Sequence, residues 1–269
     1  MLTRLKELIA YRDLIWNLVV RDLKVRYKSS ALGFLWSLLN PLFMMVVFTV
    51  LFTIMLPNNT IEKFPVFVLC ALLPWNFFSS SVMGSTLSIV ANAHLITKVY
   101  FPREVLPIST VLSNLCNFLL ALVVLFLMIF LFRVPLTPWA LLLPLVIGTQ
   151  LIFTIGLALL LATSNVFYRD TQFMVEVLML AWFFLTPVFY PIDLLPQSRV
   201  ILGFTLEIRR LAYILNPMAS LIASYRVILY HGAPPAWDFL FRTLVTALGF
   251  LGLGYSIFNR YAPTFAEEV

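Results

Sequence analysis

The sequence predicts an all-α integral membrane protein with six transmembrane helices, and its composition and the spacing of its apolar runs indicate this fold class. Of its 269 residues, 62% are hydrophobic and only 11% are charged, whereas about 25% of the residues in an average globular protein are charged. A soluble fold of this composition would leave a large apolar surface in water, so lipid must surround most of the chain. Six apolar runs are long enough to cross the roughly 30 Å hydrocarbon layer, which takes about 20 helical residues.

The predicted spans lie at residues 32–56, 64–88, 105–132, 138–163, 173–192 and 237–259. Six crossings put both termini on the same side, and the side richer in Lys and Arg is the cytoplasm. Eleven of the 18 Lys and Arg fall on that side; four of the other seven lie in one long connection, where the positive-inside rule counts least. We therefore expect cytoplasmic N- and C-termini and no signal peptide, since the first apolar run is short.

Residues 1–30 are predicted to form a cytoplasmic amphipathic segment ahead of a six-span domain, residues 31–269. An apolar stripe at helical spacing consists of Trp16, Val19, Val20, Leu23 and Tyr27. A polar and basic stripe repeats the spacing one residue later, at Asn17, Arg21, Lys24 and Lys28. Such a helix lies in the membrane interface with its cations toward anionic headgroups. The pattern leaves open whether it is only an anchor or also docks a cytoplasmic partner.

A second short amphipathic helix is predicted between the second and third spans, from Ile89 to Phe101. Residues four apart pair along its sides, as His94 does with Lys98. Pro102 ends the helix, because proline disfavours helical geometry in the preceding residue. A helix of this kind either inserts into a groove of another protein or lies on the headgroups.

The long connection between the fifth and sixth spans is predicted to form a re-entrant or interfacial hairpin on the outer side. Asn216 and Pro217 are typical of an N-cap followed by proline at the first helical position. The helix that they begin should end near Gly232, about 21 Å later at 1.5 Å per residue, which is too short to cross. The pattern does not decide between a gate and a structural lid.

Several kinds of chemistry are missing from the sequence. No G-x-x-x-x-G-K-[ST] phosphate loop occurs, so hydrolysis of a nucleotide requires another chain. Cys70 and Cys116 lie in apolar runs, and His94 and His231 are predicted on opposite sides, so no metal site is expected. Glu176 is the only acid within the predicted spans away from their ends, which argues against an ion-coupled carrier. We expect a protein that is not an enzyme and that has no nucleic-acid partner.

Five motifs occur in an order that carries a family resemblance: "RDLKVRYKSSALGFLWSLLNPL", "LLPWNFFSSS", "LITKVYFPREVLP", "NVFYRD" and "FFLTPVFYP". Together they resemble the permease subunit of type-two ATP-binding-cassette exporters for cell-surface polysaccharide, including O-antigen, capsule and teichoic acid. The resemblance covers nearly the whole chain. It implies a homodimeric channel in the bacterial inner membrane, two separate ATPase subunits that bind ATP and Mg, and an undecaprenyl-linked glycan as substrate.

The resemblance also assigns roles to residues. It implies a coupling helix at about 91–103 that contacts the ATPase through Asn92, His94, Leu95, Ile96, Lys98, Val99, Tyr100, Phe101 and Arg103. A second cytoplasmic contact is implied at Tyr168, Arg169 and Asp170. The N-terminal segment resembles the family's interface helix, with Trp16, Arg21, Lys24, Arg26, Tyr27 and Lys28. The segment at about 193–232 resembles the outer gate helices, with Asn216, Pro217 and Tyr225.

Aromatic residues make up 15% of the chain, with 25 Phe, and they predict a path for a glycan. Sugar C–H faces stack on aromatic rings, and many weak contacts without a deep trap suit a moving substrate. The channel candidates are Phe43, Phe48, Phe52, Trp75, Phe77, Phe78, Trp182, Phe183, Phe184, Phe189 and Tyr190. Any of them could instead face lipid or lie at the interface. Two other functions stay open: a same-fold exporter of a drug or lipid, and a non-transport protein acting on lipid-linked sugars.

Overall fold

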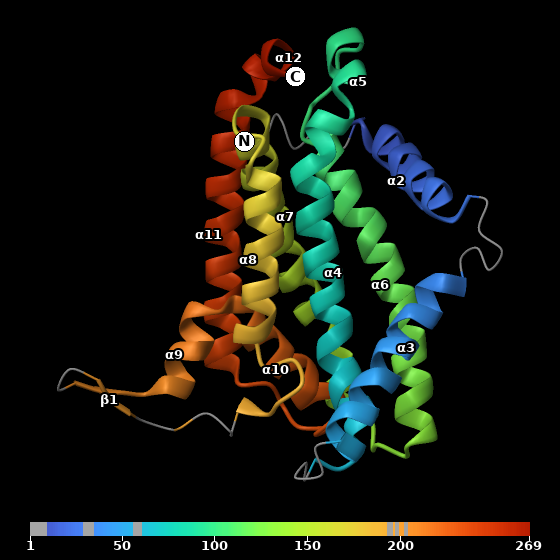
Figure 1. Cartoon of the computed structure of the whole chain (residues 1–269), viewed down its shortest axis with the longest axis vertical. Helices are drawn as coiled ribbons and strands as arrows, with labels where there is room; N and C mark the ends of the chain where they lie inside the picture. The colour runs from blue at the N-terminus through green and yellow to red at the C-terminus, as the bar shows by residue number, and fades with distance from the viewer. Residues whose placement is uncertain (1–9, 29–34, 56–60, 193–195, 197–198, 202–203) are drawn as a thin grey trace.

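The computed structural model describes residues 1–269 apart from 1–9, 29–34, 56–60, 193–195, 197–198 and 202–203. The missing parts include the beginning of the predicted N-terminal segment, both ends of the predicted first span and parts of the predicted gate region. The described residues form a bundle of long, roughly parallel helices, with short elements at its two ends (Figure 1). We refer to the end that holds α5 and α12 as the inner end, after its predicted cytoplasmic side, and to the opposite end as the outer end.

Four helices are long and apolar enough to cross a membrane, and they form the centre of the bundle. They are α4 (Phe64–Ala91), α6 (Val105–Leu131), α7 (Leu143–Phe167, preceded by the 3₁₀-helix η3, Pro138–Leu142) and α11 (Trp237–Tyr261). α4 packs on α6 and α7, and α7 packs on α11. Most of α4 is buried, which explains why its sequence is apolar all round rather than on one face.

The described part of the predicted first span is helical throughout, whereas the predicted fifth span ends earlier than the sequence suggested. α3 (Trp36–Thr49) continues as the π-helix η2 (Val50–Met55), and α8 spans Thr171–Leu185. α8 ends early because Pro187 disfavours helix at Thr186, which is extended with φ −98° and ψ 131°. By length and composition, the described residues give four spans, or five if the bent pair of outer helices counts as one. The six-span topology therefore stays a prediction.

α7 and α11 approach each other closely at Gly156 and Gly254. A Cβ atom on Gly254 would lie 2.1 Å from the carbonyl oxygen of Gly156, and one on Gly156 would lie 2.5 Å from the backbone nitrogen of Leu251. Only residues without a side chain fit here. Small residues at such crossings allow helix backbones in a membrane to pack directly on each other.

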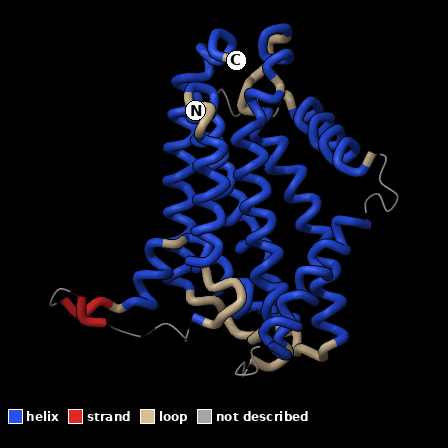
Figure 2. The backbone as a smooth tube through the Cα atoms, viewed as in Figure 1, coloured by secondary structure: helices blue, strands red, loops and turns tan. Residues whose placement is uncertain are grey.

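Three short helices lie at the inner end: α2 (Arg12–Tyr27), α5 (Ala93–Lys98) and α12 (Phe265–Glu268) (Figure 2). The 3₁₀-helix η5 (Ala262–Thr264) precedes α12. A separate group of buried apolar side chains joins these helices to the ends of the long ones. We name this group the inner apolar cluster. It consists of Leu18, Ile89, Ile96, Val105, Leu106, Leu159, Ala162, Val166, Phe258, Ala262 and Phe265. One apolar group therefore joins α2, α5 and α12 to the inner ends of α4, α6, α7 and α11.

The N-terminal helix α2 has apolar residues on two sides. Trp16, on the predicted stripe, is 62% exposed and free to contact lipid. Leu18 is buried in the inner apolar cluster, and Leu14 and Ile15 pack against that cluster. Val19, on the same predicted stripe as Trp16, is also buried, so the stripe does not lie wholly toward lipid, and α2 packs on α6, which the pattern did not predict.

At the outer end, the segment between α8 and α11 is only partly helical. An antiparallel hairpin of β1 (Arg199–Ile201) and β2 (Phe204–Leu206) precedes α9 (Ile208–Leu215) and α10 (Pro217–Leu229). The expectation of helices throughout 193–232 is therefore wrong for the hairpin, whose β-branched and aromatic residues favour strands. α9 and α10 are bent against each other by 110°, which fits the predicted re-entrant or interfacial pair.

Candidate functional site

At the inner end, α5 is separated from α4 by a corner at Asn92. Asn92 has φ −114° and ψ 27°, and its side chain donates a hydrogen bond of 2.8 Å to the carbonyl of Ser88. Arg21 of α2 donates to Asn92 Oδ1 at 3.2 Å. The predicted continuous helix to Phe101 is thus wrong at both ends, because the chain turns at Asn92 and becomes extended at Val99 (φ −130°, ψ 135°).

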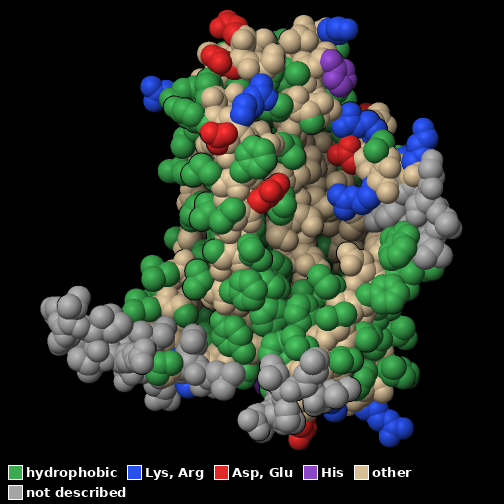
Figure 3. All heavy atoms as spheres, viewed as in Figure 1, with side chains coloured by type: hydrophobic (Ala, Val, Ile, Leu, Met, Phe, Trp, Pro, Cys, Tyr) green, Lys and Arg blue, Asp and Glu red, His purple; other side chains and the backbone are tan. Residues whose placement is uncertain are grey.

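α5 has one buried side and one open side. Ile96 is 6% exposed and belongs to the inner apolar cluster, whereas Tyr100 is 96% exposed. His94 and Lys98 are exposed and Leu95 is half-buried. On the face drawn in Figure 3, charged side chains gather toward the two ends of the molecule and are few in between. An aromatic ring held in water beside cations is suited to insertion into another protein.

The turn that follows α5 is fixed to the rest of the molecule. Phe101 is half-buried against the inner apolar cluster, and Glu104 is almost completely buried. Partial burial lowers the pKa of Arg103 from its usual value, while the neighbouring Glu104 and Tyr100 act in the opposite direction. The guanidinium stays protonated near neutral pH, so this turn carries a permanent positive charge.

The second predicted contact lies close to the first through α12. Tyr168 is 73% exposed, and Arg169 donates a hydrogen bond of 3.4 Å to the carbonyl of Glu268 in α12. α12 also packs on α5, so it lies between the two loops (Figure 1). Asp170 is exposed at the beginning of α8. The structure therefore brings the two predicted contact segments to one end of the molecule.

The predicted interface residues of α2 do not all face the same way. Arg21, Lys24 and Lys28 are exposed, and Arg21 pairs with Asp22 at 2.9 Å. Arg26 instead reaches α6, where it donates to Asn114 Oδ1 at 3.0 Å. The side chain of Tyr27 lies outside the described part of the chain.

Most of the predicted channel aromatics pack against one another between α3, α4 and α8. The ring centroids of Trp75 and Phe183 are 5.5 Å apart, and those of Phe78 and Trp182 are 5.2 Å apart. Phe189 lies 4.9 Å from Phe48 and from Phe183. The same group contains Phe52 and Phe184.

Three of the channel candidates are placed differently. Phe77 stacks on Phe118 of α6, and Tyr190 donates its hydroxyl to the carbonyl of Phe184 at 3.2 Å. Phe43 is 57% exposed on α3, whereas Phe78 has no exposed surface. In this conformation most of these rings contact one another, while Phe43 and Phe184 keep more than half of their surface exposed. Their role as a channel lining stays a prediction.

Hydrogen bonds fix the outer helices to the bundle. Asn216 caps α10, as predicted, by accepting from the backbone nitrogen of Ala219 at 3.2 Å, and Pro217 occupies the first turn. Asn216 Oδ1 also accepts from Trp182 Nε1 at 2.8 Å. Tyr225, which is fully buried, donates to Gln150 Oε1 at 2.8 Å, and Gln150 donates to the carbonyl of Pro74 at 2.7 Å.

Arg226 belongs to the same arrangement, and the sequence analysis missed its role. It is 6% exposed, and its guanidinium donates to the carbonyls of Pro187 at 2.6 Å, of Val188, and of Phe67 at 3.4 Å. It also lies over the ring of Phe67, 3.6 Å from its centroid. No described carboxylate pairs with it, so carbonyl dipoles balance its charge. We name Asn216, Tyr225, Arg226, Gln150 and Trp182 the outer polar network.

The described residues contain no group of three or more His, Cys, Asp or Glu placed to hold a metal ion.

Comparisons with known proteins cover nearly the whole chain. The family described as ABC-2 type transporter matches residues 13–230. The chain is 40% identical over 269 residues to the O-antigen export system permease protein RfbA of Myxococcus xanthus, with all of both chains covered. It is 34% identical over 260 residues to the protein of that name in Klebsiella pneumoniae, covering 95% of this chain and 94% of the other. The polysialic acid transport protein KpsM of Escherichia coli is 25% identical over 195 residues, covering 67% and 71%.

Proposed function

The chain belongs to the ABC-2 type transporter family, and from this premise we propose that it is the membrane subunit of an ATP-driven exporter of lipid-linked polysaccharide. The full-length similarity to a relative named as an O-antigen export permease carries the proposal. The chain is a multi-pass membrane protein of a family that works with an ATP-binding partner. We place it in the bacterial inner membrane, as a homodimer with two ATPase subunits.

The geometry of the inner end supports this role. Tyr100 and Lys98 face outward, where an ATPase could bind them. Ile96 joins the same short helix to an apolar cluster shared by α4, α6, α7 and α11. A displacement of α5 on ATP binding would therefore reach four long helices at once. Apolar contacts have no fixed direction, so such a cluster can transmit movement without breaking.

The outer polar network supports a gate at the other end. Asn216 and Arg226 connect the outer helices to the turn that follows α8. Opening a path beside α8 requires these hydrogen bonds to break or exchange. The undecaprenyl-linked glycan would pass there when the inner end has moved.

Deletion of the gene tests the proposal directly. We expect lipid-linked glycan to accumulate inside the cell and to disappear from the surface, and we expect the full chain to co-purify with a protein that contains a phosphate loop. Unchanged surface polysaccharide in the deletion strain contradicts the proposal. Accumulation of a drug or a sugar-free lipid would identify the same-fold alternative, and glycan that is altered but still exported would identify an enzyme acting on lipid-linked sugars.

A further inference from the structure

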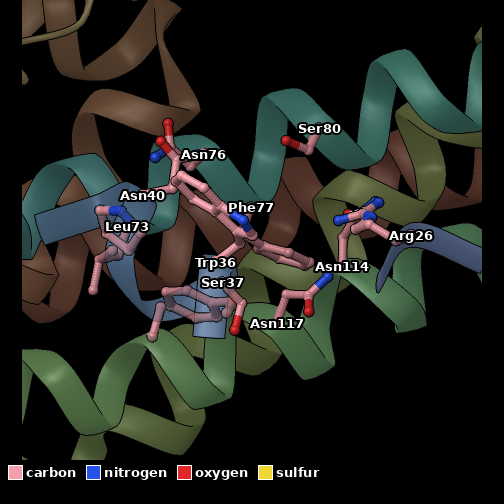
Figure 4. Close-up of a pocket in the computed structure, with 13 residues that line it drawn as sticks. Arg26, Trp36, Ser37, Asn40, Leu73, Asn76, Phe77, Ser80, Asn114 and Asn117 are labelled. Carbon is pink, nitrogen blue, oxygen red and sulfur yellow. Dashed lines mark hydrogen bonds between the residues drawn. The ribbon is translucent and has the colours of Figure 1, made fainter. Parts of the chain in front are cut away.

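A cavity that the sequence did not predict lies between four helices, on the side of α4 away from α11. Its volume is about 330 Å³, which is at the small end of the range of about 300–1,000 Å³ for small-molecule sites. α2, α3, α4 and α6 line it (Figure 4). The polar lining residues are Arg26, Ser37, Asn40, Asn76, Ser80, Asn114 and Asn117.

One end of the cavity is positively charged. Arg26 extends from α2 to Asn114, with 3.0 Å between Nη2 and Oδ1. The lining contains no Asp or Glu, and Arg26 has no ion-pair partner among the residues that the structure describes. α6 begins at Val105, at the inner end. Asn114 lies roughly 14 Å farther along this helix, at about 1.5 Å per residue. Arg26 lies on α2 rather than in a predicted span and is exposed, so its guanidinium is accessible to an anion that enters the cavity beside α6.

The rest of the cavity combines amides with aromatic rings. Asn40 of α3 and Asn76 of α4 lie away from Arg26, toward the other end of the view in Figure 4. Trp36 and Phe77 lie between the two ends and offer apolar faces. Amide and hydroxyl groups pair with the hydroxyls of a polyol, and ring faces cover its C–H groups.

We propose that this cavity binds a phosphate joined to a polyhydroxyl group, with the phosphate at Arg26 and the hydroxyls at Asn40, Asn76 and Asn117. A guanidinium binds phosphate oxygens by paired, charge-assisted hydrogen bonds. The volume accommodates one such unit and not a length of polymer. The inference rests on the proposed function, because the glycosyl phosphate of a lipid-linked glycan has this chemistry. Phosphatidylglycerol, a membrane phospholipid, has it too.

Binding to the purified full-length chain tests the site. The probes are a polyprenyl monophosphate that carries one hexose, the same lipid without the hexose, and phosphatidylglycerol, each counted by native mass spectrometry. We expect Arg26→Gln to bind both polyprenyl lipids at least tenfold more weakly, since hydrogen bonds to charged groups are among the strong ones. Arg26→Lys should retain part of the affinity. The matched control is Arg12→Gln, which removes an exposed cation from the same helix but outside the cavity.

Two further variants separate binding from folding. Ser80 is exposed on α4 and lines the cavity, so Ser80→Asp adds a repelling charge without removing a contact and should also weaken both polyprenyl lipids. Asn40 is likewise exposed, and we assign it to the polyol and not to the phosphate. Asn40→Ala should therefore weaken the hexose-bearing lipid several-fold and leave the sugar-free lipid unchanged.

The outcomes distinguish the two sources of the headgroup. A preference for the hexose-bearing lipid over phosphatidylglycerol, lost in Arg26→Gln and Ser80→Asp, supports a substrate site; the opposite preference supports a resident phospholipid. Equal binding of every probe by wild type, Arg26→Gln and Ser80→Asp overturns the inference. If surface glycan still depends on the gene in that case, only the site fails. If the deletion strain keeps its surface glycan, the proposed function fails whatever the cavity binds.

Discussion

Both ends of the molecule contain buried apolar side chains and hydrogen bonds, but the outer end adds a set of buried hydrogen bonds around one arginine, whereas the short inner helix α5 is seated mainly by apolar contact. At the outer end, Arg226, Tyr225 and Asn216 make directed hydrogen bonds to side chains and carbonyls. At the inner end, Ile96 and Phe265 lie in an apolar cluster. Hydrogen bonds need particular distances and angles, whereas apolar contact depends on area and volume. The outer end therefore favours one arrangement, and the inner end tolerates small displacements.

This difference indicates how the two ends can work together. A graded movement of α5 is compatible with an intact inner cluster. If the outer polar network acts as the proposed gate, it opens only when several hydrogen bonds break together.

The largest effect is expected from Tyr100→Ala. Tyr100 is 96% exposed, so its loss should change the free energy of unfolding by no more than about 0.5 kcal/mol. Export should nevertheless fall at least tenfold, measured as surface glycan, together with loss of ATPase co-purification. Leu141→Ala, which truncates a residue 83% exposed near the opposite end, is the control and should export normally. Normal export by Tyr100→Ala would remove α5 from the coupling role.

Arg226→Leu should have the largest effect on stability. It leaves the carbonyls of Pro187 and Val188 buried without their donor, at a cost of about 1–3 kcal/mol for each unsatisfied carbonyl. Thermal unfolding in detergent measures this loss. Arg242→Leu provides the comparison, because Arg242 is half-buried and donates to the carbonyl of Tyr213 at 2.9 Å. Equal losses of stability in Arg226→Leu and Arg242→Leu would show that the buried hydrogen bonds of Arg226 stabilise the protein no more than those of a half-buried arginine.

Gln150→Leu tests whether the outer network depends on directed bonds. The variant leaves the buried hydroxyl of Tyr225 without its acceptor, which should cost about 1–3 kcal/mol. Adding Tyr225→Phe should recover part of the loss, because both polar partners are then gone. Purely additive losses, measured by the same unfolding assay, would contradict a direct contribution from this hydrogen bond.

The smallest effect is expected from Ile96→Leu in the inner apolar cluster. A volume-conserving apolar replacement costs less than about 1.5 kcal/mol, and export should continue. Ile96→Asn buries an unpaired amide and should reduce both stability and export. If Ile96→Leu abolished export, then the inner end would require a fixed geometry, and the contrast between the ends would disappear.

Local signals allowed several of these features to be predicted from the sequence. The N-cap at Asn216 followed by Pro217 is confirmed in detail, because a cap depends only on neighbouring residues. The long apolar runs located α4, α6, α7 and α11 for the same reason. The family resemblance to type-two polysaccharide exporters is confirmed by the comparisons.

Features that depend on distant residues could not be predicted. The corner at Asn92 is bound by Arg21, which lies in another helix. The sequence predicts only an outer-side cation at Arg226. The carbonyls that accept its hydrogen bonds belong to the turn after α8, which is distant in sequence. The cavity amides Asn40, Asn76 and Asn117 come from three helices and share no spacing. In each case the residues come together only when the helices pack, so no local sequence pattern indicates the contact.

The contact between Gly156 and Gly254 has a consequence for biosynthesis. The two glycines touch across α7 and α11, so the ribosome must finish everything between Phe167 and Trp237 before the partner of α7 begins to emerge. At about 5–20 residues per second, that takes several seconds. During this interval α7 holds an unmatched glycine surface in the bilayer. A chain that stops before Gly254 never covers this surface.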